Sequence, residues 1–379
     1  MSSETFTQVR AENTANSTTE KKPTLLVMAG GTGGHIFPGI AVADELKSQG
    51  WHIHWLGTAK RMEATLVPEH GYDISFINIS GLRNKNWQAW LITPFKLLQS
   101  VLQSIQVIRR VNPDVVLGMG GYASAPGGVA AWLLRKPLVL HEQNAVAGMS
   151  NRFLANIASV VLSAFPGAFK ESIKHQVIGN PLRGDIIAID NVIPEQPASS
   201  KKVLVVGGSL GAKILNETVP QAIKQIKIQH IDVWHQTGRG NIESVLASYR
   251  AYGLSNEKVK VTEFIDDMAK AYQWADVVVC RAGALTVSEL AMAAKPAIFV
   301  PLPHAVDDHQ TKNAMYLVSR GAAKLLPQKE FNGTTLAQML NSLFISDKVV
   351  QSMAKAAHDA AHTDATTRVA KICQELLVR

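Results

Sequence analysis

A chain of 379 residues, 46% of them hydrophobic, can bury enough apolar surface for two or three packed domains, which excludes a disordered or fibrous protein. Charged residues make up 18% of the chain, and its net charge of +8 is not gathered in a basic tail, so a nucleic-acid-binding protein is not expected. Two cysteines, Cys280 and Cys373, cannot form a disulfide framework and indicate a reducing compartment.

Composition divides the chain into segments. Residues 1–22 are rich in Ser, Thr, Asn and Glu and predict a solvated tail that is not a signal peptide. A first domain over 23–190 and a second over 201–365 are expected, joined by a proline-containing linker over 191–200. Residues 366–379 have helical spacing and are expected to pack near the linker or the first domain.

The first domain is predicted to open with a strand over 24–28, a glycine loop over 30–34 and a helix from Pro38 to Gln49. The same order returns after residue 200, where a strand over 202–206 is followed by a second glycine loop. Two similar halves are therefore predicted.

Apolar strand candidates alternate with helical segments in both halves, and this alternation predicts parallel sheets. The expected fold is α/β, with two Rossmann-like domains facing across a cleft, because doubly wound sheets bind ligands beyond the carboxyl ends of their strands. The uncharged stretch 115–134 is long enough to span a bilayer, but its glycines and proline predict a strand, a turn and a helix instead. The later strand candidates cover 115–117, 138–140, 160–162, 232–235, 259–261, 277–279 and 297–300.

The glycine loop before His35 places backbone N–H groups at the start of a helix, which favours binding of an anion or a sugar oxygen. A tight turn without a ligand is the alternative. Residues 118–123 match the pattern G-x-G-x-x-A and keep open a dinucleotide-binding oxidoreductase, although that fingerprint belongs in the first strand–helix–strand unit of a domain.

Another loop, 281–289, follows a predicted strand and enters a helix. Its N–H groups at 284–286 would bind phosphate and Glu289 would accept hydrogen bonds from a ribose, whereas a first-turn acid stabilised by the helix dipole is the alternative for Glu289. The acidic pairs 266–267 and 307–308 lack the spacing of metal ligands and are expected to cap helices or lie in solvated loops, so no metal is predicted.

Seven short motifs follow one another along the chain: GGTGGHIFPG at 30–39, GMGGY at 118–122, HEQN at 141–144, GNPLR at 179–183, GGS at 207–209, FIDD at 264–267 and ALTVSE at 284–289. In this order they resemble the MurG family of bacterial cell-wall glycosyltransferases, which is part of glycosyltransferase family 28. The resemblance covers the chain from about residue 25 to 320.

The resemblance implies a GT-B architecture and an inverting transfer of N-acetylglucosamine from UDP-GlcNAc to the C4 hydroxyl of the N-acetylmuramoyl residue of lipid I. The product would be lipid II, used in peptidoglycan synthesis. The transfer would need neither a cofactor nor a metal. The implied location is the cytoplasmic face of the cell inner membrane, as a peripheral protein, and partners among the cell-wall synthesis and division proteins stay open.

Carried over by motif, the resemblance divides the site residues between donor and acceptor. The backbone of Ile265 would bind uracil, Glu289 the ribose hydroxyls and Gln310 the sugar hydroxyls. The implied donor-binding residues are Thr32, Gly33, Gly34, Asn144, Arg183, Ser209, Ile265, Ala284, Leu285, Thr286, Val287, Ser288, Glu289 and Gln310, and the implied acceptor-binding residues are Gly120, Gly121, Tyr122, His141 and Asn151.

An inverting transfer needs a base that takes the proton of the acceptor hydroxyl. His35 is the first candidate, because the positive end of a helix disfavours the imidazolium and leaves a neutral ring that can accept a proton. A structural histidine that bonds to the backbone or positions a diphosphate is the alternative. Glu142 is the second candidate for the base.

Basic and aromatic residues are interleaved between residues 82 and 96, a pattern typical of a segment that binds an anionic membrane surface. An amphipathic helix with its apolar face in the core is the alternative, and it is favoured for 97–108. The residues expected at the membrane are Leu82, Arg83, Lys85, Trp87, Trp90, Phe95 and Lys96.

Two other functions stay open. A non-hydrolysing UDP-GlcNAc 2-epimerase could use the same scaffold, but it would not need the basic aromatic segment. A nucleotide-sugar-binding regulator would bind UDP-GlcNAc without releasing UDP.

Overall fold

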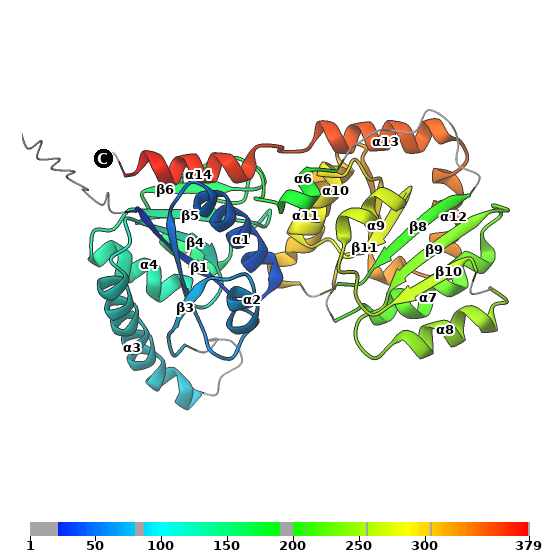
Figure 1. The fold of residues 1–379 in the computed structure, drawn as a ribbon. Coiled ribbons are helices and arrows are strands. Elements are labelled where there is room, and N and C mark those ends of the chain that lie inside the picture. The colour runs from blue at the N-terminus through cyan, green and yellow to red at the C-terminus, as the bar shows by residue number, and fades with distance from the viewer. Residues whose placement is uncertain are drawn as a thin grey trace, which may run out of the picture.

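The computed structural model describes residues 22–79, 87–189, 200–208, 210–254, 257–303 and 305–377. These residues form two α/β domains that lie side by side, each built on one parallel sheet (Figure 1). The prediction of an α/β fold with two Rossmann-like domains is confirmed.

The first sheet has the strand order β3-β2-β1-β4-β5-β6-β7, and all neighbouring strands are parallel. Its strands are β1 (Thr24–Ala29), β2 (His52–Gly57), β3 (Asp73–Phe76), β4 (Val115–Gly120), β5 (Leu138–Glu142), β6 (Val160–Ser163) and β7 (Gln176–Val177). The helices of this part are α1 (Gly33–Ser48), α2 (Glu63–Glu69), α3 (Trp87–Val111), α4 (Ser124–Leu133), α5 (Met149–Leu154) and α6 (Gly184–Ile187).

The second sheet repeats this topology with the order β10-β9-β8-β11-β12-β13. Its strands are β8 (Lys201–Val206), β9 (Ile231–Gln236), β10 (Val259–Thr262), β11 (Val277–Cys280), β12 (Ala297–Phe299) and β13 (Ala323–Leu325). The helices are α7 (Lys213–Gln225), α8 (Ile242–Ala251), α9 (Met268–Trp274), α10 (Ala284–Met292), α11 (His309–Val318), α12 (Gly333–Leu343), α13 (Asp347–Asp359) and α14 (Ala365–Glu375), with short 3-10 turns at Val306–Asp308 and Gln328–Glu330.

The central strand β1 is buried along its whole length, as its continuous apolar run predicts for a strand covered on both faces. Leu25 and Val27 pack in one cluster with residues of α1 and α14. Leu26 and Met28 point to the other face and pack with residues of α3 and α4. Helices therefore cover both faces of the first sheet.

Each sheet has a switch point, where two neighbouring strands lead into helices on opposite faces. In the first sheet these strands are β1 and β4, and in the second they are β8 and β11. The loops that follow them contain the glycine motifs at 30–34, 118–121 and 207–211 and the segment 281–283. The fold thus gathers the glycine loops at the carboxyl ends of the central strands.

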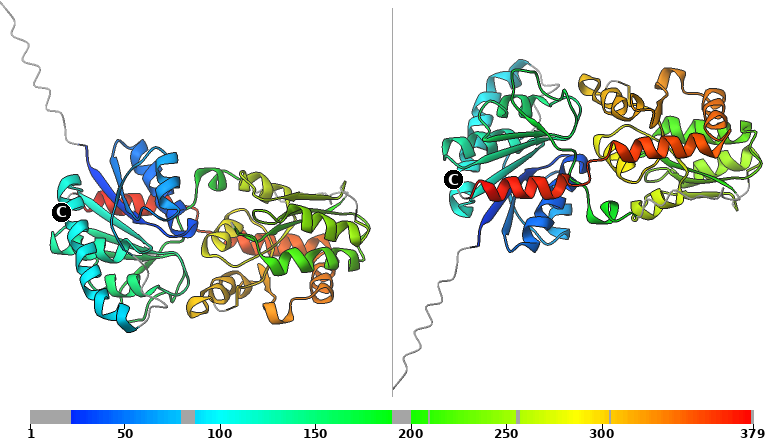
Figure 2. Two further views of the ribbon diagram at one scale, coloured as in Figure 1. Left: turned by 90° about the horizontal axis from the view of Figure 1, so that it is seen from below. Right: turned by 90° about the horizontal axis from the view of Figure 1, so that it is seen from above.

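The chain crosses from the second domain back to the first near residue 362, between α13 and α14, which run one after the other over the two domains (Figure 2). Val369, Ala370 and Cys373 of α14 are buried in the same cluster as α1 and β1. The hydroxyl of Thr366 accepts a hydrogen bond from the N–H of Leu182 at 3.1 Å and donates one to its carbonyl. The crossing segment is therefore held against the chain that follows β7.

Helix α3 packs an apolar face in the core over 97–108, as expected, since Val107 and Ile108 are buried in the cluster of Leu26 and Met28 and Val101 and Ile105 pack against it. Ser100 and Ser104 are fully buried, whereas Leu98 and Leu102 are 57% and 52% exposed. These two leucines lie outside the face that the core covers. The buried serines donate to the carbonyls of the preceding turn, which satisfies their hydroxyls within the core.

The stretch 115–134 forms β4, a glycine turn and α4, as expected. Within the part of the chain that the structure describes, no helix has both the length and the apolar character needed to span a bilayer.

Candidate active site

The first glycine loop connects β1 to α1 and is held from below by a buried carboxylate. Gly31 has a φ of +89°, which glycine adopts without strain, and its N–H donates to Oε2 of Glu63 at 2.8 Å. The other oxygen of Glu63 accepts from the backbone N–H and the hydroxyl of Thr58. Glu63 has no local signal in the sequence, because its role depends on a contact across 32 residues.

Beyond Gly31, the loop presents Thr32, Gly33 and Gly34 at the start of α1. Thr32 is the extended N-cap residue, and its side chain makes no capping bond. The N–H groups of the first turn therefore have no side-chain partner at this end, as the anion-binding interpretation requires. His35 lies in the same turn and is partly exposed.

The glycine loop at 118–121, after β4, packs directly on the loop at 30–34. A Cβ at Gly121 would lie 2.4 Å from the carbonyl oxygen of Gly30, and one at Gly120 would lie 2.9 Å from Nδ1 of His35. Both glycines have positive φ angles. Gly120 and Gly121 were predicted to contact the acceptor. In the structure Gly120 leaves room for His35, and Gly121 leaves room for the backbone of Gly30.

Tyr122 follows these glycines and is 40% exposed. The guanidinium of Arg61 lies 5.1 Å from the centre of its ring, a distance typical of a cation–π contact. The predicted acceptor residue Tyr122 therefore has a cationic neighbour that sequence reasoning did not identify.

His35 is hydrogen bonded through Nδ1 to Oε1 of Gln143, at 2.8 Å. Gln143 in turn contacts Nδ1 of His141 through its Nε2 atom at 3.2 Å. His141 is fully buried, and its Nε2 bonds to the carbonyl oxygen of Gly179 at 2.9 Å. Burial lowers the pKa of His141 to about 4, although the bond to Gly179 opposes this, so the ring is neutral near pH 7.

The predicted acceptor residue His141 is therefore buried in this structure, and both of its ring nitrogens form hydrogen bonds within the protein. Gln143 was not predicted as a site residue. Its position inside the motif HEQN was the available signal, but the contact with His35 crosses 108 residues and has no local pattern.

Glu142 is buried and accepts four hydrogen bonds. Its carboxylate oxygens receive the backbone N–H and the side-chain amide of Asn144, the N–H of Gly148 and the amide of Asn151, at 2.9 to 3.2 Å. These bonds hold the turn from 142 to 151. A proton-accepting role for Glu142 would require it to release some of these donors.

Loops of the first domain bond to helices α10 and α11 of the second. The N–H of Ala145 donates to Oδ1 of Asn313 at 2.7 Å, and the Asn313 amide donates to Asn144. The amide of Asn180 donates to the hydroxyl of Ser288 at 3.0 Å. The predicted residues Asn144 and Ser288 therefore each accept a hydrogen bond across the domain interface, Asn144 from Asn313 and Ser288 from Asn180.

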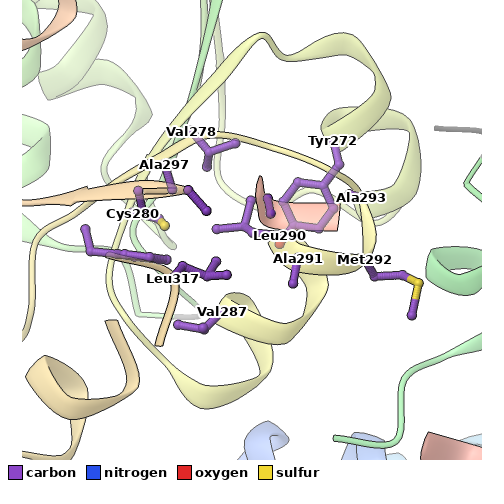
Figure 3. Packing of buried hydrophobic residues seen from close by; sticks show 14 of the residues in the cluster. Tyr272, Val278, Cys280, Val287, Leu290, Ala291, Met292, Ala293, Ala297 and Leu317 are labelled. Atoms are coloured by element: carbon purple, nitrogen blue, oxygen red, sulfur yellow. The ribbon is translucent and has the colours of Figure 1, made fainter. Parts of the chain in front are cut away.

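Helix α10 carries the predicted donor residues of the second domain. Val287, Leu290 and Ala291 point into the core, where they pack near Val278 and Cys280 of β11 (Figure 3). This packing fixes the N-terminus of α10, which begins at Ala284, so that Ser288 and Glu289 are only partly buried.

Glu289 accepts a hydrogen bond from the hydroxyl of Tyr272 at 2.9 Å. Burial raises the pKa of the Glu289 carboxyl above its usual value, while the Tyr272 bond and the charge of Arg183 act in the opposite direction. Tyr272 was not predicted, because it lies on α9, outside the motif that contains Glu289.

The remaining donor candidates lie around α10. Oε1 of Gln310 accepts the N–H of Leu302 at 2.8 Å, and Arg183 stacks on Phe37 with 5.4 Å between guanidinium and ring centre. Ile265 packs at the edge of the core beneath α10. Leu285 and Thr286 are partly exposed on α10. Ser209 lies outside the described residues.

The acidic pairs behave as the sequence indicated, with one addition. Asp267 caps α9 by accepting the N–H of Lys270 at 2.8 Å. Asp307 forms an ion pair with Arg152 of the first domain at 2.9 Å, a contact that was not predicted. No group of three or more potential metal-ligating side chains was found among the described residues.

Exposed aromatic and basic residues lie on or next to α3, α4 and α5, and α4 packs against both other helices. Phe95 of α3 is 74% exposed, and Trp132 of α4 and Phe153 of α5 are each more than half exposed. Lys96, Arg109 and Arg135 are exposed on the same elements or next to them. We call this region the α3–α5 surface.

Only part of this surface carries residues that were predicted at the membrane. Leu82, Arg83 and Lys85 lie outside the described residues, and the side chains of Trp87 and Trp90 do as well. Phe95 and Lys96 lie on the surface as expected. Trp132 and Phe153 were missed because their helices come from distant parts of the sequence.

The two domains have parallel sheets and bond to each other near the carboxyl ends of their strands. His35 lies in the first turn of α1 and Glu289 in the second turn of α10. This arrangement is that of a two-domain glycosyltransferase of the GT-B class. Family models agree: residues 25–163 match the glycosyltransferase family 28 N-terminal domain, and residues 202–369 match the glycosyltransferase family 28 C-terminal domain. The chain belongs to glycosyltransferase family 28.

Relatives and a solved structure are similar over nearly the full chain. A protein from Colwellia psychrerythraea is 61% identical over 94% of this chain and 93% of its own length, and one from Aeromonas hydrophila is 56% identical over 93% and 97%. Both are named UDP-N-acetylglucosamine–N-acetylmuramyl-(pentapeptide) pyrophosphoryl-undecaprenol N-acetylglucosamine transferase. The crystal structure of Acinetobacter baumannii MurG is 39% identical, with a TM-score of 0.81 over 93% of this chain and 99% of that one.

Proposed function

We propose that the protein transfers N-acetylglucosamine from UDP-GlcNAc to the C4 hydroxyl of the N-acetylmuramoyl residue of lipid I, forming lipid II with inversion at the anomeric carbon. The names of the relatives from Colwellia and Aeromonas support this substrate pair. The observation that carries the proposal is the bonded connection from His35, through Gln143 and Asn180, to Ser288 beside Glu289. It joins a candidate base in one domain to a candidate donor site in the other.

The donor is assigned to the second domain. Glu289 accepts the ribose hydroxyls, because its carboxylate has one hydroxyl partner, Tyr272, and capacity for more. The N–H groups at the start of α10 bind the diphosphate, whose negative charge the helix dipole favours. The backbone at Ile265 binds uracil, and Gln310 binds the sugar hydroxyls.

The reaction forms one bond and breaks one. The acceptor oxygen attacks the anomeric carbon from the side opposite UDP, and the bond between that carbon and the diphosphate oxygen breaks. His35 takes the proton of the attacking hydroxyl, and UDP leaves with the electron pair of the broken bond. The departing charge is stabilised by helix N-termini and by Arg183 in place of a metal ion.

We also assign the α3–α5 surface to the membrane that carries the acceptor, at the cytoplasmic face of the inner membrane. Exposed Phe95, Trp132 and Phe153 beside basic residues fit an interface between headgroups and acyl chains. Each lysine or arginine near an anionic leaflet contributes about 1 kcal/mol of binding free energy.

The test measures UDP release from UDP-GlcNAc in EDTA, with and without a lipid I analogue, and follows the acceptor by mass spectrometry. We expect release only with acceptor, together with the addition of one N-acetylhexosamine. Loss of activity in EDTA that a divalent cation restores would contradict the metal-free mechanism.

Two alternatives have their own outcomes in the same assay. Conversion of UDP-GlcNAc to its 2-epimer without acceptor would indicate an epimerase. Binding of UDP-GlcNAc without any consumption in the presence of acceptor would indicate a binding protein. Either result would reject the transferase.

A further inference from the structure

Gln143 is the link between two histidines of the first domain. It is 1% exposed, and it follows directly on the end of β5. Its Oε1 atom lies 2.8 Å from Nδ1 of His35, and its Nε2 atom lies 3.2 Å from Nδ1 of His141. His35, Gln143 and His141 thus form a chain of hydrogen bonds, and two backbone carbonyls determine where its protons lie.

The first carbonyl belongs to Gly179, and it can only accept a hydrogen bond. Its oxygen lies 2.9 Å from Nε2 of His141, so this nitrogen must carry the proton of the neutral ring. Nδ1 of His141 is then an acceptor, and it faces the amide nitrogen of Gln143.

The second carbonyl belongs to His141 itself and lies 3.3 Å from Nε2 of Gln143. Both neighbours of this end of Gln143 are acceptors, so the amide group must be oriented with its NH2 toward His141. Oε1 of Gln143 therefore faces His35 and can only accept. It follows that Nδ1 of His35 carries a proton and that Nε2 of the neutral ring has the free lone pair.

Residues at the domain interface hold both Gln143 and Gly179 in place. The carbonyl of Gln143 accepts from the amide of Asn180 at 3.2 Å, and the same amide group donates to Ser288 of α10. Gly179, with a φ of +85°, lies against His362 of the crossing segment, where a Cβ would come within 2.2 Å of that side chain. Gly179, whose carbonyl determines which nitrogen of His141 carries the proton, is thus held between His141 and His362.

We propose that Gln143 is a positioning residue that holds His35 in the tautomer whose Nε2 can accept a proton. The inference rests on the proposed function, because it assigns this lone pair to the acceptor hydroxyl. Gln143 acts only through His35 and His141, and it does not itself touch substrate.

The tautomer can be measured without turnover, by long-range proton–nitrogen NMR on the full chain labelled with nitrogen-15 in its histidine rings. His35 is assigned by its loss in His35→Asn. We expect the His35 ring to have a protonated Nδ1 and an unprotonated Nε2, and to become a mixture of tautomers in Gln143→Met. His235, buried in the second domain between Tyr249 and Asn216, serves as the internal control for folding.

Kinetics supply the second readout. In Gln143→Met we expect kcat to fall about 10- to 100-fold, as when a partner that orients a functional histidine is removed, with little change in the Kd for UDP-GlcNAc. In Gln143→Glu, a carboxylate next to His35 favours the imidazolium, so the acidic limb of the kcat profile should move to higher pH and part of kcat should return. Gln225→Met, at an exposed glutamine of α7, is the matched control.

The outcomes separate the two proposals. An Nε2-protonated His35 in the wild type, or an unchanged tautomer in Gln143→Met, overturns the role of Gln143. A mixed tautomer with unchanged kcat leaves the role of Gln143 standing and rejects His35 as the base. If Gln143→Met does not fold, as judged by the His235 signals, the pH shift of Gln143→Glu decides, and an unshifted profile overturns the proposal.

Discussion

The two domains have the same strand order around their central strands, yet they present different chemistry at the same edge. In the first domain, the helix after the central strand β1 carries His35 in its first turn. In the second, the helix after the corresponding strand β8 has no histidine or acid in its first turn, and the carboxylate of Glu289 comes from α10, after β11. The counterpart of α10 in the first domain, α4, carries no acid.

Both switch points thus provide helix N-termini. The sequence of each loop and helix determines which side chain lies near them, a histidine in the first domain and a carboxylate in the second. A histidine on one side and a carboxylate on the other allow proton transfer and donor binding to be assigned to separate domains. Four predictions test this comparison of the domains, beginning with the largest expected effect.

His35→Ala should remove the proton transfer that we assign to the first domain. We expect kcat to fall by about 10²- to 10⁴-fold, the usual contribution of a general base, while the Kd for UDP-GlcNAc stays within a few-fold of the wild type. Turnover by product mass and donor binding by calorimetry provide the two numbers. Near-normal turnover would exclude His35 as the base.

Glu289→Ala should weaken the donor binding that we assign to the second domain. Loss of a charged acceptor for ribose hydroxyls costs about 1.5–3 kcal/mol, which corresponds to a 10- to 150-fold weaker UDP affinity. Glu289→Gln keeps one acceptor oxygen and should lose less. An unchanged Kd for UDP in the alanine variant would remove Glu289 from the donor site.

The double change of Phe95 and Trp132 to serine tests membrane binding, which we assign to the first domain alone. Each aromatic side chain contributes about 1.5–3 kcal/mol when it leaves water, so binding to anionic vesicles should fall by at least tenfold, while turnover of a short-chain soluble acceptor is kept. Ile345→Ser, which changes an 80% exposed residue of the second domain, is the control. Vesicle binding that survives the double change would place the membrane surface elsewhere.

The smallest effect concerns two buried histidines, one in each domain. Burial lowers the pKa of His141 to about 4 and that of His235 to about 3, from 6.5. Since the unfolded chain binds these protons first, each histidine stabilises the fold fully above pH 6.5 and loses that contribution as the pH falls toward the folded-state pKa.

Between pH 7.5 and 5 this loss is about 2 kcal/mol of unfolding free energy per histidine. Urea unfolding at the two pH values should show a smaller pH dependence for His235→Gln than for the wild type, even if that variant is less stable overall. An equal pH dependence would show that His235 is not neutral when buried.

Sequence reasoning identified the features that are local. The loop with His35 and the segment with Glu289 each follow a strand and open a helix, and such patterns are visible within about ten residues. Glu63, Gln143 and Tyr272 were missed because each acts on a residue that only the fold brings near. For α3, periodicity predicted an apolar face in the core but not the exposure of Leu98 and Leu102, since periodicity alone does not show how far the core covers a helix.

The crossing segment near residue 362 has a consequence for the synthesis of the molecule. Val369, Ala370 and Cys373 of α14 complete the core of the first domain, although the whole second sheet lies between them and β7 in the sequence. The first domain therefore exposes an apolar gap beside α1 on the ribosome until α14 has been made. The domain whose strands are made first is thus the one whose core is closed last.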